Sequence, residues 1–266
     1  MMSSTPAEAG TPKKRDSFAP RYPRLSRRAQ TELLSSIVAR SQHVAGSSLP
    51  PVVVFDLDGT LMDNRPRSIA ILREVAASWE ARHPDVARRL SSITPDALTY
   101  LVSDSLRRLG VTAEELVIEA EAYWRTKFFR DDHLVHDIAI NGAVEFARDC
   151  YAAGATLVYL TGRDLPLMGT GTFKSIRDLG FPIGVAGTQV ILKPNADMAD
   201  EAFKRLVAPE LLRIGRVIAA FDNEPGNCNA FREAYPDCAS VLVDTQHMPG
   251  APPLADGVPV ILEFSR

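Results

Sequence analysis

The amino-acid sequence predicts an α/β fold, namely a parallel sheet with helices on both faces and an all-helical insertion. Short β-branched runs alternate with helical patterns over residues 140–266, as expected when helices connect parallel strands. One further run of this kind, Val52 to Phe55, comes earlier, and from 64 to about 139 only helical periodicity is present. We therefore expect a core made of residues 49–63 and 140–266, and a helical cap made of residues 64–139.

The first 48 residues are expected to be a mobile tail followed by a short amphipathic helix. Residues 1–24 are rich in Ser, Thr, Pro and Ala, so they carry too little apolar surface to offset the entropy lost on ordering. Apolar residues recur at helical spacing within Ser26 to Arg40, at Leu33, Leu34, Ile37 and Val38. This helix can pack on the body of the chain or serve an interface, and a linker at 46–48 follows it.

The core begins with the run from Val52 to Phe55, whose unbroken apolar character is typical of a strand buried on both faces. Further strands are expected at Ala155 to Leu160, Val190 to Leu192, Arg216 to Phe221, Ser240 to Val243 and Val258 to Phe264. Helices are expected at Gly142 to Ala153, Thr172 to Leu179 and Asp200 to Leu212.

The cap shows two apolar stripes at helical spacing. The first consists of Ile69, Leu72, Val75 and Ala76, and the second of Leu98, Leu101, Val102, Leu106 and Leu109. Because the cap follows the carboxyl end of the first strand, where open α/β sheets bind ligands, it is placed to cover a site.

Composition and charge narrow the class of function. The net charge of -3 and the pI near 6.0 give no reason to expect nucleic acid or an anionic membrane as a partner. The spacing of Cys150, Cys228 and Cys238 indicates neither a zinc site nor a disulfide framework. No run of signal-peptide or transmembrane type is present, so a cytoplasmic location is expected, and the oligomeric state stays open.

The chemistry is concentrated at the end of the first strand, in the segment Phe55-Asp56-Leu57-Asp58-Gly59-Thr60. Two carboxylates held this close repel each other, and a cation would relieve the repulsion. Mg²⁺ is suitable because it prefers hard oxygen ligands. Gly59 allows a sharp turn that brings backbone N–H groups towards an anion.

This segment resembles the first motif of the haloacid dehalogenase superfamily, most of whose members are phosphatases. The resemblance covers roughly residues 52–264 and implies a Rossmann-like core with a cap. It implies Asp56 as nucleophile, Asp58 as general acid and base, and Gly59 and Thr60 as substrate contacts. A strand ending in Thr161, Gly162 and Arg163 matches the second motif, with Thr161 bonding a phosphoryl oxygen. Arg163 either contacts phosphate or only holds its loop.

The third motif requires a lysine, and two lysines are candidates. We favour Lys204, on the helix that precedes the strand Arg216 to Phe221, over Lys193, in the loop before that helix. The fourth motif places Asp222 at the end of that strand as a magnesium ligand, together with Asp56 and the backbone carbonyl of Asp58.

The fourth motif departs from the commoner family pattern, because Asn227 stands where a second carboxylate is usual. Glu224 or Asn227 could reach the metal through water, or Glu224 could cap the following turn. His247 follows another strand end, but a lone histidine is more often structural, so it is left out of the site.

The resemblance implies that Asp56 attacks phosphorus to form an aspartyl-phosphate, which water then hydrolyses. Asp58 would have to keep a proton beside an ionised Asp56. A phosphomutase, or an inactive protein that binds a phosphorylated ligand, remains an alternative.

A cap over the site favours a small phosphorylated metabolite over a large phosphoprotein. Sugar phosphates, phosphoglycolate-like acids and nucleotides all stay open. Candidate cap contacts, most of them expected to be ordinary surface residues, are Arg65, Arg67, Trp124, Arg125 and Lys127.

Overall fold

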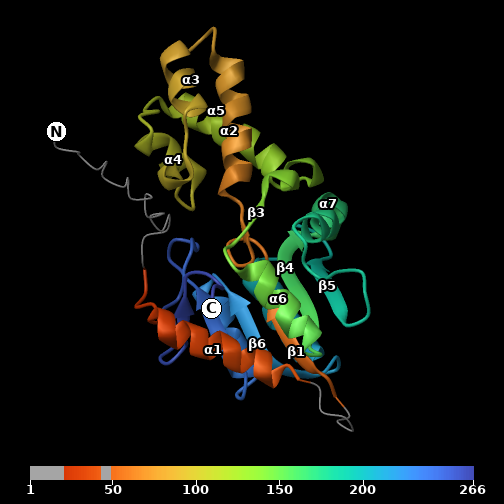
Figure 1. The fold of residues 1–266 in the computed structure, drawn as a ribbon. Coiled ribbons are helices and arrows are strands. Elements are labelled where there is room, and N and C mark those ends of the chain that lie inside the picture. Colours follow the sequence, from red (N-terminus) through yellow and green to blue (C-terminus); the bar gives the residue numbers. More distant parts are fainter. Residues whose placement is uncertain (1–20, 43–48) are drawn as a thin grey trace, which may run out of the picture.

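The computed structural model describes residues 21–42 and 49–266, and most of the expected mobile tail lies outside these ranges. Its centre is a six-stranded sheet in the order β5-β4-β1-β6-β7-β8, in which all neighbouring strands are parallel. The strands are β1 (Pro51–Phe55), β4 (Thr156–Asp164), β5 (Thr188–Lys193), β6 (Arg216–Asp222), β7 (Ala239–Val243) and β8 (Val260–Ile261). The predicted parallel α/β sheet is confirmed (Figure 1).

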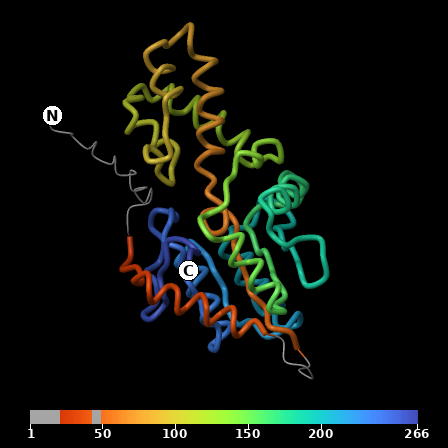
Figure 2. The backbone as a smooth tube through the Cα atoms, in the orientation of Figure 1, coloured from red at the N-terminus to blue at the C-terminus, as the bar shows by residue number. Residues whose placement is uncertain are grey.

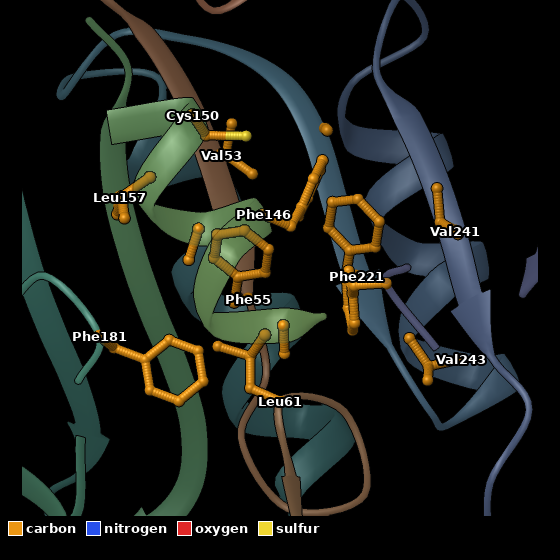
Figure 3. Close-up of a cluster of buried hydrophobic side chains, with 14 of the residues drawn as sticks. Val53, Phe55, Leu61, Phe146, Cys150, Leu157, Phe181, Phe221, Val241 and Val243 are labelled. Carbon is orange, nitrogen blue, oxygen red and sulfur yellow. The ribbon is translucent and has the colours of Figure 1, made fainter. Parts of the chain in front are cut away.

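Helices cover both faces of the sheet. One face carries α1 (Arg27–Arg40), α6 (Ala143–Ala152) and α7 (Leu165–Asp178), and the other carries α8 (Asp200–Leu211) and α9 (Pro225–Ala234). Each face of the sheet packs on its own hydrophobic cluster, and β1 contributes to both. Val53 and Phe55 belong to the first cluster, on the α1 and α6 side, whereas Val52 and Val54 belong to the second, on the α8 and α9 side. The sequence of β1 is therefore apolar throughout. Figure 3 shows Phe55 of the first cluster close to Phe146 and Phe221.

Helix α1 is amphipathic as predicted and packs on the body of the chain. Ser26 caps its N-terminus by accepting a hydrogen bond from the Ala29 N–H. Leu34 and Ile37 are fully buried in the first cluster. This apolar face is therefore used within the chain.

Several element boundaries differ from the expectation. Helix α7 begins at Leu165 rather than at Thr172, because Asp164 caps it and Pro166 fits its first turn. Helix α9, which was not among the expected helices, follows β6 directly. The last strand is two residues long, and the rest of 258–264 is irregular.

The cap contains α2 (Arg65–Trp79), α3 (Pro84–Ser91), α4 (Val102–Arg108), α5 (Glu114–Phe128) and the 3₁₀ turns at Pro95–Ala97 and Asp131–His136. Its helices share a hydrophobic cluster that draws only on residues between Ile69 and Trp124. A two-stranded antiparallel stem, β2 (Met62–Asp63) with β3 (Ile138–Ala139), links it to the core. The tube in Figure 2 shows both connections running side by side.

The cap stripes are buried as predicted except at their margins. Leu101 was expected in the second stripe but is 41% exposed, because α4 begins only at Val102 and Leu101 is its extended N-cap residue. Within the described residues, no helix has both the length and the apolar character needed to cross a bilayer.

Candidate active site

A cavity of about 390 Å³ lies between the carboxyl ends of the central strands and the cap. Its core side is lined by Asp56, Asp58, Gly59, Thr161, Gly162, Arg163, Lys204, Asn223, Glu224 and Asn227, among others. Its cap side is lined by residues of α2, α4 and α5 and by the segment Leu98 to Leu101. The sheet topology therefore brings residues of all four predicted motifs, Lys204 among them, to one cavity.

Asp56 follows β1 directly and is 6% exposed. Its backbone N–H continues the sheet by donating to Phe221 O at 3.0 Å, which fixes it beside the end of β6. Its Oδ2 accepts a hydrogen bond from Thr60 Oγ1 at 3.0 Å. One carboxylate of the motif is thus held rigidly at the floor of the cavity.

Gly59 has a φ of 79°, in the left-handed region that favours glycine. A Cβ at this position would lie 2.7 Å from Asn223 Nδ2 and 3.2 Å from Thr245 Oγ1. The motif therefore needs glycine here both for the turn and for the close approach of β6 and β7.

Lys204 lies between two carboxylates. Its Nζ is 2.7 Å from Asp56 Oδ1 and 2.7 Å from Asp222 Oδ2, and the side chain is 3% exposed. Lys193 lies elsewhere, with its Nζ 2.6 Å from Asp200 Oδ1 and 3.0 Å from Met198 O. Of the two candidate lysines, the geometry therefore brings only Lys204 to Asp56.

Burial raises the pKa of Asp56 to about 7, with smaller increases from the charges of Asp222 and Asp58. The charge and hydrogen bond of Lys204 oppose this shift without cancelling it. Burial would lower the pKa of Lys204, but its two carboxylate partners outweigh burial and raise it. One ammonium thus incompletely neutralises the carboxylates around it.

Asp222 is completely buried at the end of β6. Its Oδ1 accepts hydrogen bonds from Glu224 N at 2.9 Å and from Asn227 Nδ2 at 3.0 Å. Glu224 is the N-cap residue of α9 and accepts from Met248 N at 3.0 Å, and burial raises its pKa to about 7. The amide Oδ1 of Asn227 is buried and has no hydrogen-bond partner.

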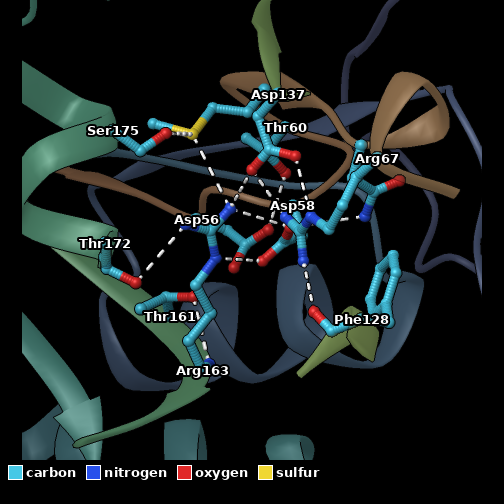
Figure 4. Close-up of polar contacts among 12 residues, drawn as sticks. Asp56, Asp58, Thr60, Arg67, Phe128, Asp137, Thr161, Arg163, Thr172 and Ser175 are labelled. Carbon is cyan, nitrogen blue, oxygen red and sulfur yellow. Dashed lines mark hydrogen bonds and ion pairs between the residues drawn. The ribbon is translucent and has the colours of Figure 1, made fainter. Parts of the chain in front are cut away.

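Asp58 lies in an ion-pair network with two buried arginines (Figure 4). Arg163 donates to it from Nε at 2.6 Å and from Nη2 at 2.9 Å, and Arg67 of α2 donates from Nη2 at 2.7 Å. Asp137, fully buried, accepts from both arginines at 2.5 to 2.8 Å. Arg163 is therefore occupied in holding its loop to the cap stem.

The pKa values of the two motif aspartates are shifted in opposite directions. Burial would raise the pKa of Asp58, but the charges and hydrogen bonds of Arg163 and Arg67 outweigh it and hold this pKa well below its usual range. The pKa of Asp56 is raised instead. Asp58 has two guanidinium partners whereas Asp56 shares one ammonium, and the expectation that Asp58 keeps a proton beside a metal-bound Asp56 stays a prediction.

Thr161 and Gly162 lie in β4 at the cavity wall. Thr161 is 1% exposed, and its Oγ1 accepts from the Arg163 N–H at 3.2 Å, so its own hydroxyl proton is free to turn towards a ligand. A Cβ on Gly162 would lie 2.1 Å from Asp200 Oδ2. A side chain at this position would require the Asp200 carboxylate to move.

The predicted cap contacts divide into two groups. Arg65, Arg67, Trp124 and Arg125 line the cavity, whereas Lys127 does not and instead lies over the ring of Tyr123 at 5.6 Å. Arg65 and Arg67 are buried, which corrects the expectation that they are ordinary surface residues. Burial is possible because each has a carboxylate partner, Asp63 for Arg65 and Asp137 for Arg67.

Sequence reasoning missed three residues of the site. Asp137 carries the arginine network, Tyr100 lines the cavity with its pKa raised to about 12 by burial, and Asn223 bonds Thr60. A carboxylate beside the predicted cap boundary was the only signal for Asp137, and it is weak. His247, left out of the site, does not line the cavity and lies beside the ring of Tyr22.

The donor set around Asp56 fits a hard cation such as Mg²⁺. Carboxylates of Asp56 and Asp222 are both buried at one edge, and the Asn227 amide oxygen beside them is unsatisfied. The described residues hold no cluster of three or more His, Cys, Asp or Glu side chains spaced for a metal. A metal here would therefore depend on main-chain oxygen, such as the Asp58 carbonyl, and on water.

No protein-family model matches the sequence, and no curated protein matches it. Among solved structures, the chain is similar to the protein tyrosine kinase A (PtkA) of Mycobacterium tuberculosis, with a TM-score of 0.48, 17% identity, and coverage of 80% of this chain and 94% of that one. It is similar to a predicted phosphatase of Clostridium acetobutylicum, with a TM-score of 0.43, 18% identity, and coverage of 74% of this chain and 86% of that one. It is also similar to a haloacid dehalogenase-like family hydrolase of Streptococcus pneumoniae, with a TM-score of 0.40, 12% identity, and coverage of 69% of this chain and 80% of that one.

Two of the similar solved structures are described as haloacid dehalogenase-like hydrolases, from Streptococcus pneumoniae and Bacteroides fragilis. At such identities the neighbours say nothing of the activity or substrate of this chain. Both have to be inferred from the site itself.

Proposed function

We propose that this chain is a magnesium-dependent phosphatase of the haloacid dehalogenase superfamily, which hydrolyses a small phosphate monoester through an aspartyl-phosphate on Asp56. One observation carries the proposal. A buried carboxylate at the end of the central strand faces an enclosed cavity and is held at 2.7 Å by a buried lysine. Such a group is costly for stability and suited to attack on a charged, metal-assisted centre.

In the first step a carboxylate oxygen of Asp56 forms a bond to phosphorus, the ester P–O bond breaks, and the leaving alcohol takes up a proton. Lys204 reduces the repulsion between the Asp56 carboxylate and the incoming phosphate. Thr161 orients a phosphoryl oxygen through its hydroxyl group, whereas the backbone N–H groups of Gly59 and Thr60 donate to main-chain oxygens within their own turn. In the second step water attacks phosphorus, which releases inorganic phosphate and restores Asp56.

The carboxylates of Asp56 and Asp222 and the carbonyl of Asp58 would hold Mg²⁺, and the ion would supply charge neutralisation. Lys204 then no longer needs to neutralise Asp222 and remains available to Asp56. Asp58 acts as acid and base only after it leaves Arg163 and Arg67, because both arginines stabilise its ionised form.

One observation favours a second candidate function. With Asp58 ion-paired, the chain could bind a phosphorylated ligand, or carry phosphate on Asp56, without rapid hydrolysis. This is the binding or regulatory protein that the sequence left open, and it shares the site but not the turnover.

Release of phosphate from p-nitrophenyl phosphate with and without Mg²⁺ tests the proposal. The wild type should turn over only with Mg²⁺, and Asp56→Asn should be inactive. Asp178→Asn is the matched control, because Asp178 is an exposed aspartate of α7 that lies outside the cavity. This variant should release phosphate at the wild-type rate. Activity that survives Asp56→Asn would exclude Asp56 as nucleophile. No turnover on any ester, with an acid-labile phosphate trapped on Asp56, would favour the second candidate.

A further inference from the structure

We infer that the cap side of the cavity is a subsite for a flat, uncharged aromatic leaving group, an inference that rests on the proposed function. Three aromatic side chains at the end of α5 form its wall: Trp124, Phe128 and Phe129. Ring centroids of Trp124 and Phe128 are 4.3 Å apart in a stacked arrangement, and those of Phe128 and Phe129 are 5.1 Å apart edge to face. These contacts join the three rings into one apolar surface.

The wall is held in place before any ligand binds. Phe128 lies between Trp124 on one side and the guanidinium of Arg67, 4.3 Å from its ring centre, on the other. Trp124 Nε1 donates to Ser68 Oγ at 3.0 Å. Phe128 is covered on both sides, so a ligand would pack against Trp124 and Phe129, and it would lose little further entropy because these rings are already ordered.

Apolar side chains on both sides of the cavity extend this wall. Leu98, Leu101, Val102 and Met168 also line it. Leu101 is 41% exposed and Phe129 is 42% exposed, and both line the cavity, whereas Ile118 and Val135 of the cap are exposed outside it. Exposed apolar groups gathered in an enclosed cavity indicate a ligand surface rather than packing.

The charges of the cavity disfavour a second anionic group on the substrate. Every cationic side chain that lines it in the described part of the chain is already bonded to a carboxylate. These are Arg65 with Asp63, Arg67 and Arg163 with Asp137, Arg125 with Glu121, and Lys204 with Asp56. A carboxylate or second phosphate on the leaving group would compete with these partners at the four buried cations, and only Arg125, whose side chain is 66% exposed, is open to solvent.

Of the polar side chains on the cap side, Ser68 bonds Trp124, and Thr99 bonds Ser105 and the Leu101 carbonyl; Tyr100 and Glu121 also line it. On the aromatic wall itself, stacking and desolvation would select the leaving group. The cavity of about 390 Å³ is large enough for a ring system above the phosphate. Of the substrate classes left open by the sequence, phosphoglycolate-like acids are therefore disfavoured. An aryl-bearing ester and a nucleotide both have a flat aromatic ring on an uncharged leaving group, so both fit the subsite.

The test compares primary alkyl esters, in which the leaving oxygen is of the same chemical type: 1-naphthylmethyl phosphate, ethyl phosphate, 2-phosphoglycolate and adenosine 5′-monophosphate. We expect kcat/KM for the naphthylmethyl ester to exceed that for 2-phosphoglycolate at least about tenfold. Phe129→Ala should lower kcat/KM for the naphthylmethyl ester about fivefold, mainly through a higher KM. The same change should alter kcat/KM for ethyl phosphate less than about twofold. Phe173→Ala is the matched control, because Phe173 is 44% exposed and lies outside the cavity.

Equal kcat/KM for the naphthylmethyl and phosphoglycolate esters, or no selective loss in Phe129→Ala, would overturn the inference. Comparable turnover of adenosine 5′-monophosphate would identify the aromatic group as a nucleobase, and its absence would identify an aryl ester. If no ester is hydrolysed, the proposed function fails, and calorimetric binding decides the inference by itself. Tighter binding of 1-naphthylmethylphosphonate than of phosphonoacetate, lost in Phe129→Ala, would support the subsite, and equal binding would overturn it.

Discussion

Asp137 offers the sharpest test of how the cap is joined to the site. Its side chain is fully buried and accepts hydrogen bonds from Arg67 and Arg163, whose side chains are 0% and 2% exposed. With Asp58 the network holds two guanidinium groups and two carboxylates, so its charges balance. The isosteric change Asp137→Asn would leave Arg67 and Arg163 sharing Asp58 alone, so the buried network would carry one uncompensated positive charge.

Removal of one member of a buried ion pair costs about 3 to 5 kcal/mol. This is a large share of the roughly 5 to 15 kcal/mol that stabilises a typical folded protein. For a chain of this size it corresponds to a fall in Tm of roughly 10 °C. Thermal unfolding followed by circular dichroism, with urea unfolding as a second measure, gives the value directly.

Glu32→Gln is the control, because the Arg28–Glu32 pair is 90% and 63% exposed and should contribute less than about 0.5 kcal/mol. Arg67→Met in the Asp137→Asn background should recover part of the loss, since it removes the unpaired charge. A loss below about 1 kcal/mol in Asp137→Asn, or no recovery in the double variant, would refute the buried-pair reasoning.

Three further predictions concern the catalytic edge. Lys204→Ala should lower kcat for phosphate release about 100-fold or more, whereas Lys193→Ala should stay within about threefold, and equal losses would contradict the assignment of Lys204. Without metal, the stability of Asp56→Asn relative to the wild type should increase from about pH 4 to pH 7 and then level off, as measured by Tm against pH. The reason is that the pKa of Asp56 is about 7 in the folded chain, above its unfolded value, so its ionisation opposes folding as the pH rises; a pH-independent difference would exclude this. Removal of metal with EDTA should abolish turnover. Added Mg²⁺ should raise the Tm of the wild type more than that of Asp222→Asn. Equal increases in Tm would exclude Asp222 as a ligand.

The arrangement of the core could be read from the sequence because its signals are local. The run from Val52 to Phe55 is apolar on both faces, and parallel strands of that kind end at one edge of a sheet. Asp56 follows β1, Asp222 ends β6, and Thr161 lies in the last part of β4, so their meeting follows from strand order. The side chain of Lys204 reaches the same edge from the start of α8.

The sequence by itself thus determined the α/β class, the helical character of the cap and the identity of the residues at the sheet edge, since all of these follow from periodicity and motif order. Only the tertiary structure decided their ionisation and surroundings. Arg163 meets Asp58 across 105 residues, and its charge, together with that of Arg67, lowers the pKa of Asp58. Arg67 also meets Asp137, across 70 residues. Leu101 and Phe129 line the cavity for the same reason: exposure depends on where the cap packs over the core, and no local pattern records that.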